Sequence, residues 1–206
     1  MSDPLMSKSQ FKVWFLIPLI VFLGLIVMFF ARLGKDTNVV FDNALNRPVP
    51  EFNLPLLSDP DTKVTNADLP KTPFIINVWG SWCPTCYEEH PFFMELHQQQ
   101  VPIVGVNYKD ELDKAQEYLT NGGDPYVFSF RDFDGSFAID LGLTGAPESF
   151  IVDTQGNIRQ HIVGEISAEN WQSRIKPCMD LLTEMGQKQA ALDTPEITKQ
   201  IAEVCK

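Results

Sequence analysis

Hydrophobic residues follow three patterns along the chain, and the first is a long uncharged segment near the N-terminus. Residues 13–31 are mostly apolar and contain no charged residue. About 20 apolar residues in a helix cover the roughly 30 Å hydrocarbon layer of a membrane. The segment therefore predicts a single transmembrane anchor over 13–31. We expect residues 1–12 in the cytoplasm, but this orientation must come from the chemistry of the domain, because the charges on the two sides of the segment are balanced. A cleaved signal peptide is the alternative, but the stretch is long for one and no small-residue cleavage pattern occurs before Arg32.

Polar residues without periodicity form the second pattern, over residues 32–50. The stretch contains Arg47-Pro48-Val49-Pro50, and such a composition is typical of a linker. We expect the folded domain to occupy residues 51–186 and a C-terminal helical extension to occupy 187–206, because Thr194-Pro195-Glu196 is a helix start.

Short apolar runs separated by polar turns form the third pattern and indicate an α/β domain. The expected strands are 52–57, 63–65, 74–78, 103–106, 126–130, 150–152 and 158–163, and the expected helices lie around 91–96, 112–119, 137–141 and 171–185. Strand, helix, strand, helix in succession is typical of a parallel βαβ unit, whereas the last two strands read as an antiparallel hairpin. The fold class is therefore α/β, with a mixed central sheet and helices on both faces.

Length, charge and cysteine content narrow the functional classes. The chain has 206 residues, 44% of them hydrophobic, which suits one membrane segment and one domain of ordinary size. A formal net charge of −11 argues against nucleic acid, whose phosphates require clustered Lys and Arg. The four cysteines include one close pair, which is too few for a disulfide scaffold and wrongly spaced for a zinc ribbon.

That close pair is Cys83-Pro84-Thr85-Cys86, placed directly after the apolar run 74–79 and at the start of a helix. Unpaired backbone N–H groups and the helix dipole favour the thiolate of Cys83, which is the expected nucleophile, and Cys86 is the expected resolving thiol. A structural disulfide or half of a metal site are the alternatives, while a covalent haem site would need His where Tyr87 stands. The pattern indicates thiol–disulfide exchange without a metal or organic cofactor, because the dithiol itself carries two electrons.

The stretch from Trp79 to Cys86, together with the distant Gly145-Ala146-Pro147, resembles the active site of thioredoxin-fold proteins. The resemblance implies that Pro147 follows a cis peptide bond and lines the site, and that Ala146 offers backbone groups to an extended substrate. It further implies that Trp79 and Trp82 shape the rim.

A more specific resemblance rests on residues 82–90, residues 145–150 and the N-terminal anchor. Together they resemble the membrane-tethered thiol:disulfide interchange proteins of cytochrome c biogenesis, the DsbE/CcmG type. This resemblance implies a single-pass protein of the inner membrane whose domain faces the periplasm and reduces apocytochrome c or haem-attachment components. It also implies a membrane thiol transporter of the DsbD or CcdA kind as electron donor. A general thioredoxin-like reductant or oxidant, or a tethered binding module without turnover, stays open as an alternative.

By the same resemblance, two acidic residues belong to the site. Glu89 would transfer a proton, although a glutamate early in a helix commonly does no more than interact with the helix dipole. Glu148, directly after Pro147, would contact the substrate. Departures from the family pattern at Gly80, Thr144 and Ser149 put the shape of the substrate in doubt more than the reaction.

The two remaining cysteines lie in the C-terminal part of the chain. Cys178 is on the apolar face of the closing helix, where a lone cysteine is most often an inert buried thiol. Ile197, Ile201 and Cys205 share one face of the final helix. If that helix docks on the closing helix, Cys178 and Cys205 can form a second, structural disulfide. The distance and orientation of the two side chains decide whether this bond forms.

Overall fold

The computed structural model describes residues 16–33, 44–188 and 194–205. The chain divides into two compact units, residues 1–41 and 42–206, which are considered separately. In the first unit, α2 (Leu16–Leu33) is a helix whose large hydrophobic side chains are mostly exposed as far as Phe29. Within the described ranges, the structure has no helix that is both long and apolar enough to span a membrane. Residues 1–15 lie outside the described residues, and they include the start of the predicted anchor.

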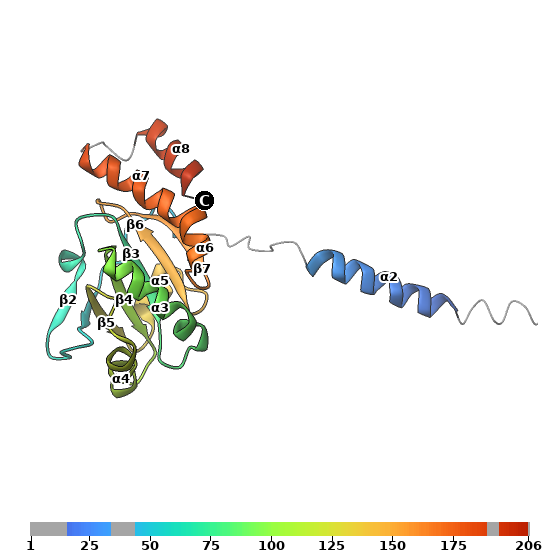
Figure 1. Cartoon of the computed structure of the whole chain (residues 1–206), viewed down its shortest axis with the longest axis horizontal. Helices are drawn as coiled ribbons and strands as arrows, with labels where there is room; N and C mark the ends of the chain where they lie inside the picture. The colour runs from blue at the N-terminus through green and yellow to red at the C-terminus, as the bar shows by residue number, and fades with distance from the viewer. Residues whose placement is uncertain (1–15, 34–43, 189–193, 206) are drawn as a thin grey trace, which may run out of the picture. The chain divides into compact units, whose positions relative to one another are not determined.

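The second unit is built around a five-stranded mixed sheet with the strand order β5-β4-β3-β6-β7 (Figure 1). The strands are β3 (Phe74–Trp79), β4 (Ile103–Tyr108), β5 (Phe128–Asp132), β6 (Glu148–Val152) and β7 (Ile158–Val163). β3, β4 and β5 are parallel, whereas β6 runs antiparallel to both β3 and β7. The predicted mixed sheet is therefore confirmed.

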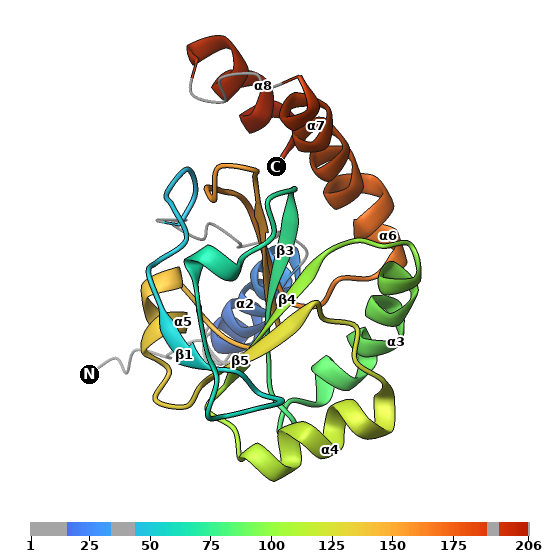
Figure 2. The same ribbon diagram turned by 90° about the vertical axis from the view of Figure 1, so that its left-hand side faces the viewer.

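Helices and a small hairpin cover the two faces of this sheet (Figure 2). The helical segments are η1 (Asn66–Asp68), α3 (Pro84–Gln98), α4 (Leu112–Gly122), α5 (Ser136–Leu141), α6 (Ala168–Asn170), the π-helical turn η2 (Trp171–Ile175), α7 (Lys176–Gln187) and α8 (Pro195–Val204). β1 (Asn53–Pro55) and β2 (Lys63–Thr65) pair antiparallel, as predicted.

Two hydrophobic clusters lie on opposite faces of the sheet because successive side chains of a strand point to opposite sides. Ile75 and Trp79 of β3 pack in one cluster with α3, α4, η2 and α7. Ile76 and Val78 pack in the other cluster with α5, β2 and the segment that precedes β1. Every residue of β3 is buried, which is expected for a central strand covered on both faces.

The folded domain begins earlier than the predicted boundary at residue 51. Ala44 and Val49 are buried, and the backbone of this segment pairs with the turn between β6 and β7. Asn46 N donates to Ile158 O at 2.7 Å, and Ile158 N donates to Arg47 O at 2.9 Å. The proline-rich stretch read as linker is thus part of the domain from residue 44 onward, because its backbone groups find partners there. Residues 34–43 of the predicted linker lie outside the described residues.

At the other end of the chain, a disulfide joins α7 to the end of α8. Cys178 and Cys205 are bonded, with their Cα atoms 4.8 Å apart. Their exposed fractions are 0% and 5%, and Ile201 of α8 is buried beside them at 2%. The predicted second disulfide is confirmed, and the final helix belongs to the domain rather than projecting from it.

Candidate redox site

The dithiol lies where the central strand β3 passes into helix α3. Cys83 is the N-cap residue of α3, and Pro84 occupies the first helical position, where its missing N–H costs nothing. Cys83 and Cys86 form a disulfide with Cα atoms 5.3 Å apart, and each residue is only 2% exposed. Cys86 N donates to Cys83 Sγ at 3.2 Å. A backbone donor and the helix dipole thus both act on the sulfur of Cys83, which favours its thiolate once the bond is reduced.

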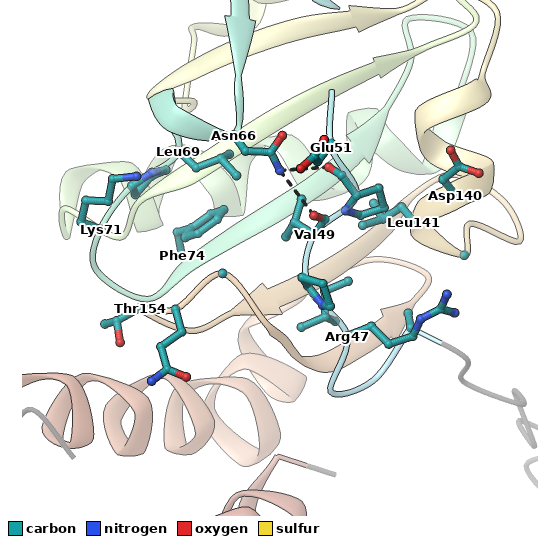
Figure 3. A pocket seen from close by; sticks show the side chains of 18 of the residues that line it. Arg47, Val49, Glu51, Asn66, Leu69, Lys71, Phe74, Asp140, Leu141 and Thr154 are labelled. Atoms are coloured by element: carbon teal, nitrogen blue, oxygen red, sulfur yellow. Dashed lines mark hydrogen bonds between the residues drawn. The ribbon is translucent and has the colours of Figure 1, made fainter. Parts of the chain in front are cut away.

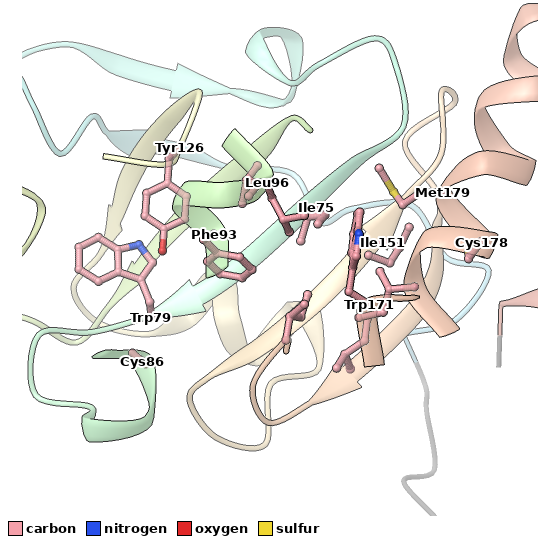
Figure 4. Packing of buried hydrophobic residues seen from close by; sticks show 14 of the residues in the cluster. Ile75, Trp79, Cys86, Phe93, Leu96, Tyr126, Ile151, Trp171, Cys178 and Met179 are labelled. Carbon is pink, nitrogen blue, oxygen red and sulfur yellow. The ribbon is translucent and has the colours of Figure 1, made fainter. Parts of the chain in front are cut away.

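The two tryptophans predicted at the rim lie in different environments. Trp82 is 50% exposed, and its Nε1 donates to Tyr108 O at 3.0 Å. Trp79 is only 1% exposed and stacks against Tyr118 and Tyr126, with ring centroids 4.9 and 5.7 Å away. Figure 4 shows Trp79 beside Tyr126 in the buried cluster that also contains Cys86. The structure therefore leaves Trp82 at the surface and corrects the placement of Trp79, which supports the site from inside the core.

The proline loop has the predicted conformation. The Ala146–Pro147 peptide bond is cis. Pro147 is buried, and its carbonyl accepts a hydrogen bond of 3.0 Å from Gly164 N. Ala146 is half-buried and packs against the cluster that contains both cysteines of the dithiol. Because Val78 pairs with Glu148, the register of β6 places Pro147 beside the end of β3, where the chain turns into the dithiol, although about 60 residues separate the two in sequence.

Glu148 does not face a substrate. It is 1% exposed, and its carboxylate accepts hydrogen bonds from the backbone N–H groups of Thr144 and Gly145, at 3.0 to 3.2 Å, and from the Thr144 hydroxyl. His161 Nε2 of β7 lies 2.9 Å from its other side. The expected substrate contact is corrected: Glu148 is buried and holds the residues before the cis-proline in place.

Glu89 lies on the same side of α3 as Cys86, three residues later, a spacing that makes the two side chains neighbours. It is 3% exposed. Its carboxylate accepts hydrogen bonds from Ile166 N at 2.5 Å and from Asn77 Nδ2 at 3.2 Å. Burial raises the pKa of Glu89 to about 8, and these two hydrogen bonds limit the rise. A carboxyl group in this position can hold or release a proton near neutral pH, as the acid predicted from the motif would have to do.

His90, the next residue in α3, is bonded to the backbone and is not placed to exchange protons with the dithiol. It is 6% exposed, and its Nε2 donates to the carbonyl of Gly123 at 3.0 Å. Burial lowers its pKa, so the ring is neutral at pH 7.

Sequence reasoning missed several polar residues that support the site. Tyr118 Oη donates to Cys86 O at 2.8 Å, and Tyr126 Oη donates to Asn77 Oδ1 at 2.9 Å. The available signal was Asn77 itself, a single amide in the apolar run of a strand that is buried on both faces. A buried amide in such a run must be hydrogen-bonded, and its partners mark a polar network.

A second missed residue is Asp110, which anchors the turn that leads to the dithiol. It is 5% exposed and accepts hydrogen bonds from Ser81 N at 2.6 Å and Ser81 Oγ at 2.7 Å. Asn107 Nδ2 donates to the same carboxylate at 2.9 Å. The turn before Cys83 is therefore fixed to the end of β4.

A separate cavity of about 930 Å³ opens at the other end of β3, around Phe74 (Figure 3). Val49, Glu51 and Leu69 line it together with the turn between β6 and β7. No cysteine lines this cavity, so it is not part of the redox site. The described portions of the chain contain no group of three or more His, Cys, Asp or Glu side chains able to hold a metal ion.

A dithiol that caps a helix at the end of a central strand, close to a cis-proline, defines a thioredoxin-like thiol–disulfide oxidoreductase. A model of the redoxin family matches residues 44–175. The thiol:disulfide interchange protein DsbE of Pseudomonas aeruginosa is 39% identical over 181 residues, which cover 88% of this chain and 96% of that protein. Its namesake from Escherichia coli K12 is 38% identical over 183 residues, covering 85% and 96%. The chain belongs to the redoxin family, as a thiol:disulfide interchange protein of the DsbE type.

Solved structures confirm the fold at lower sequence similarity. A secreted thiol-disulfide isomerase from Corynebacterium glutamicum superposes with a TM-score of 0.56 at 22% identity, over 68% of this chain and 85% of that one. A protein described as a putative thioredoxin from Neisseria meningitidis gives 0.56 at 23% identity, over 70% and 93%. These likenesses show the thioredoxin-like fold.

Proposed function

We propose that this protein is a periplasmic reductant that opens disulfides in apocytochrome c, or in haem-attachment components, before haem is attached. The observation that carries the chemistry is the Cys83–Cys86 pair at the N-terminus of α3, packed in one cluster with Ala146 of the cis-proline loop. The choice of substrate is supported by the resemblance of residues 82–90 and 145–150 to the cytochrome c biogenesis type and by the similarity to DsbE proteins.

In this mechanism the thiolate of Cys83 attacks one sulfur of the substrate disulfide. A bond forms between Cys83 Sγ and that sulfur, the substrate S–S bond breaks, and the other substrate sulfur leaves as a thiolate that takes a proton from water. Cys86 then attacks Cys83 Sγ and releases the second substrate thiolate. Two electrons pass from the dithiol to the substrate, and the protein is left as the disulfide seen in the structure.

The second step needs a base, because Cys86 is buried and must lose its proton before it can attack. Glu89 is the group placed to accept it. Its pKa of about 8 leaves a fraction of Glu89 ionised near neutral pH, and the carboxylate can then accept the proton of Cys86. Trp82, next to Cys83, is an exposed aromatic ring and offers a surface to the substrate.

The proposal also includes a location and an electron donor. An inner-membrane anchor is supported by the uncharged sequence 13–31, which would place the domain in the periplasm, and a DsbD- or CcdA-type transporter would return electrons to the disulfide. Protease added to intact spheroplasts tests the location. Digestion of the domain with the anchor left in the membrane fraction is the expected result, and protection of the domain would contradict it.

A trapping experiment tests the substrate. In a Cys86→Ala chain, the mixed disulfide on Cys83 cannot resolve, and covalent partners can be identified from membranes by mass spectrometry. We expect apocytochrome c or haem-attachment components, absent from a control chain carrying both Cys83→Ala and Cys86→Ala. A broad set of unrelated periplasmic proteins would instead indicate general disulfide exchange.

The reduction potential of the dithiol distinguishes a reductant from an oxidant. Equilibration of the dithiol with a glutathione or dithiothreitol buffer gives this value, and a potential near that of thioredoxin, about −270 mV, is expected of a reductant. A value near that of an oxidant such as DsbA, about −120 mV, would overturn the reductive assignment.

A further inference from the structure

Asn77 occupies the middle of the central strand and is fully buried, at 0% exposure. The strand register places it opposite Gly105 of β4 and Ser149 of β6. Its amide makes three hydrogen bonds with side chains. Nδ2 donates to Glu89 Oε2 at 3.2 Å and to Ser149 Oγ at 3.1 Å, and Oδ1 accepts from Tyr126 Oη at 2.9 Å. Both N–H bonds and one lone pair of the amide are therefore used inside the protein.

Tyr126 decides which end of the amide faces Glu89. The hydroxyl of Tyr126 is buried and needs an acceptor, which is the amide oxygen of Asn77. If the amide turned over, the tyrosine O–H would face an NH₂ group, and the amide oxygen would face the carboxylate of Glu89. When Glu89 is ionised, two acceptors would then be in contact in a buried site, which is unfavourable. The Tyr126 bond thus holds a donor against Glu89.

We propose that Asn77, oriented by Tyr126, is a positioning residue that keeps a hydrogen-bond donor on Glu89 and so sets how readily Glu89 takes the proton of Cys86. This inference rests on the proposed role of Glu89 in the exchange reaction. The hydrogen bonds of the amide go to Glu89, Ser149 and Tyr126 and not to the dithiol, so its effect passes through the carboxylate. The three side chains come from β3, from α3 and from the segment before β5, so they are joined only in the folded domain.

Several groups besides the amide of Asn77 act on the pKa of Glu89. Glu165, before α6, raises the pKa of Glu89, whereas the N–H of Ile166 and the amide of Asn77 lower it. Tyr118 and Tyr126 also face the carboxyl group, but burial raises the pKa of both, so they stay neutral near pH 8. The reduced thiols at the start of α3 are the remaining titratable neighbours. Asn77 is the side chain within the described ranges whose hydrogen bond favours the ionised form of Glu89.

Two substitutions in the full chain test the proposal. Asn77→Leu removes the donor, and Tyr126→Phe keeps the ring but frees the amide to turn, so that its oxygen can accept from a protonated Glu89. A titration followed by ¹³C NMR of the glutamate side chains, with Glu89 assigned from a Glu89→Gln chain, measures the pKa directly. A hydrogen bond to a charged group corresponds to a shift of about one pKa unit, and we expect an upward shift of that size in both variants.

Tyr118→Phe is the matched control. It deletes the same hydroxyl from a ring that stacks on the same Trp79, but that hydroxyl bonds to Cys86 O and does not touch Asn77. The pKa of Glu89 should stay within a few tenths of a unit in this variant. Should Asn77→Leu fail to fold, Tyr126→Phe still decides the question because it changes a single hydroxyl.

A rapid-mixing assay supplies the second readout. When the reduced chain meets dithiobis-nitrobenzoate, Cys83 releases one coloured thiolate and the attack of Cys86 on the mixed disulfide releases the other. The pH at which this second step reaches half its maximal rate should rise by the same amount as the pKa of Glu89. If Glu89→Gln leaves the second step and its pH profile unchanged, the proposed role of Glu89 fails. If Glu89→Gln slows that step but Asn77→Leu and Tyr126→Phe titrate like the unmodified chain, the inference about Asn77 fails alone.

Discussion

Removing the disulfide between α7 and the end of α8 gives a stability change that can be worked out from the structure. Cys178 and Cys205 are separated by 27 positions. The chain-entropy relation for a closed loop of that length gives about 3.5 kcal/mol at 25 °C. Replacement by alanine adds little, because both residues are small and the bond, rather than packing volume, is what is lost. With a urea dependence near 2 kcal/mol per molar, the unfolding midpoint should fall by about 1.7 M.

The assay is urea unfolding of the full chain in detergent micelles, followed by tryptophan fluorescence, with the Cys83–Cys86 bond kept oxidised and checked by mass. Three variants are compared: Cys178→Ala, Cys205→Ala and the double substitution. Because either single change already breaks the bond, each should cost about as much as the double change, a strong departure from additivity. A midpoint equal to that of the unmodified chain would refute the reasoning, since α8 would then unfold independently of the domain. Single effects that sum to the double effect would equally show that the bond does not act as a crosslink.

Further predictions concern residues around the dithiol. Because the folded pKa of Glu89 is about 8 against an ordinary 4.5, the folded state holds the proton more strongly, and stability should fall as pH rises from 4.5 to 8, by about 5 kcal/mol in all. Urea unfolding at pH 5 and pH 9 should show about 4 kcal/mol of this difference, and Glu89→Gln should remove it. Glu148→Ala removes the buried acceptor of the proline-loop donors and of His161, and we expect a loss of about 3 kcal/mol by urea unfolding. A loss below about 1 kcal/mol would show that the loop is ordered without it. Trp79→Ala should lower the free energy of unfolding by about 3–5 kcal/mol, because this side chain is buried. Trp82→Ala should lower it by less than about 1 kcal/mol and should instead raise KM for a peptide disulfide. Equal effects of the two substitutions on stability would contradict the difference in burial.

The parts of the site that could be predicted from sequence are those encoded by neighbours in the chain. The dithiol is recognisable because an apolar strand, Cys83, Pro84 and Cys86 follow one another, and Pro84 at the first helical position makes Cys83 the cap. The spacing of apolar residues predicts the closing helix. Cys178 and Cys205 lie on the apolar faces of two helices, and these faces are buried against each other. In each case, local spacing determines which side chains face the same way.

The predictions that were wrong depended on contacts between distant segments. Every residue of β3 is buried, so alternation carried no information about the direction of Trp79, which points into the core. Glu148 follows a proline at the site, but it is the first residue of β6. Its carboxylate lies 2.9 Å from Nε2 of His161 in β7, a contact that the sequence does not indicate. Residues 44–50 look like a linker because their backbone partners lie in a turn about 110 residues later.

Separation along the chain also explains why Asn77 is the one sign of the network beneath the dithiol in the sequence, whereas its partners could not be predicted from it. A Cβ atom at Gly105 of β4 would lie 2.2 Å from Ser129 Oγ and 2.8 Å from Trp79 Nε1, so a larger residue there would displace the serine hydroxyl and the indole. With the indole in that position, the rings of Tyr118 and Tyr126 stack on it from α4 and from the segment before β5. Their hydroxyls then reach Cys86 O and the amide of Asn77. A glycine outside the motif therefore determines where the hydrogen-bond donors around the dithiol are placed, and substitution of Gly105 should disturb proton transfer as well as packing.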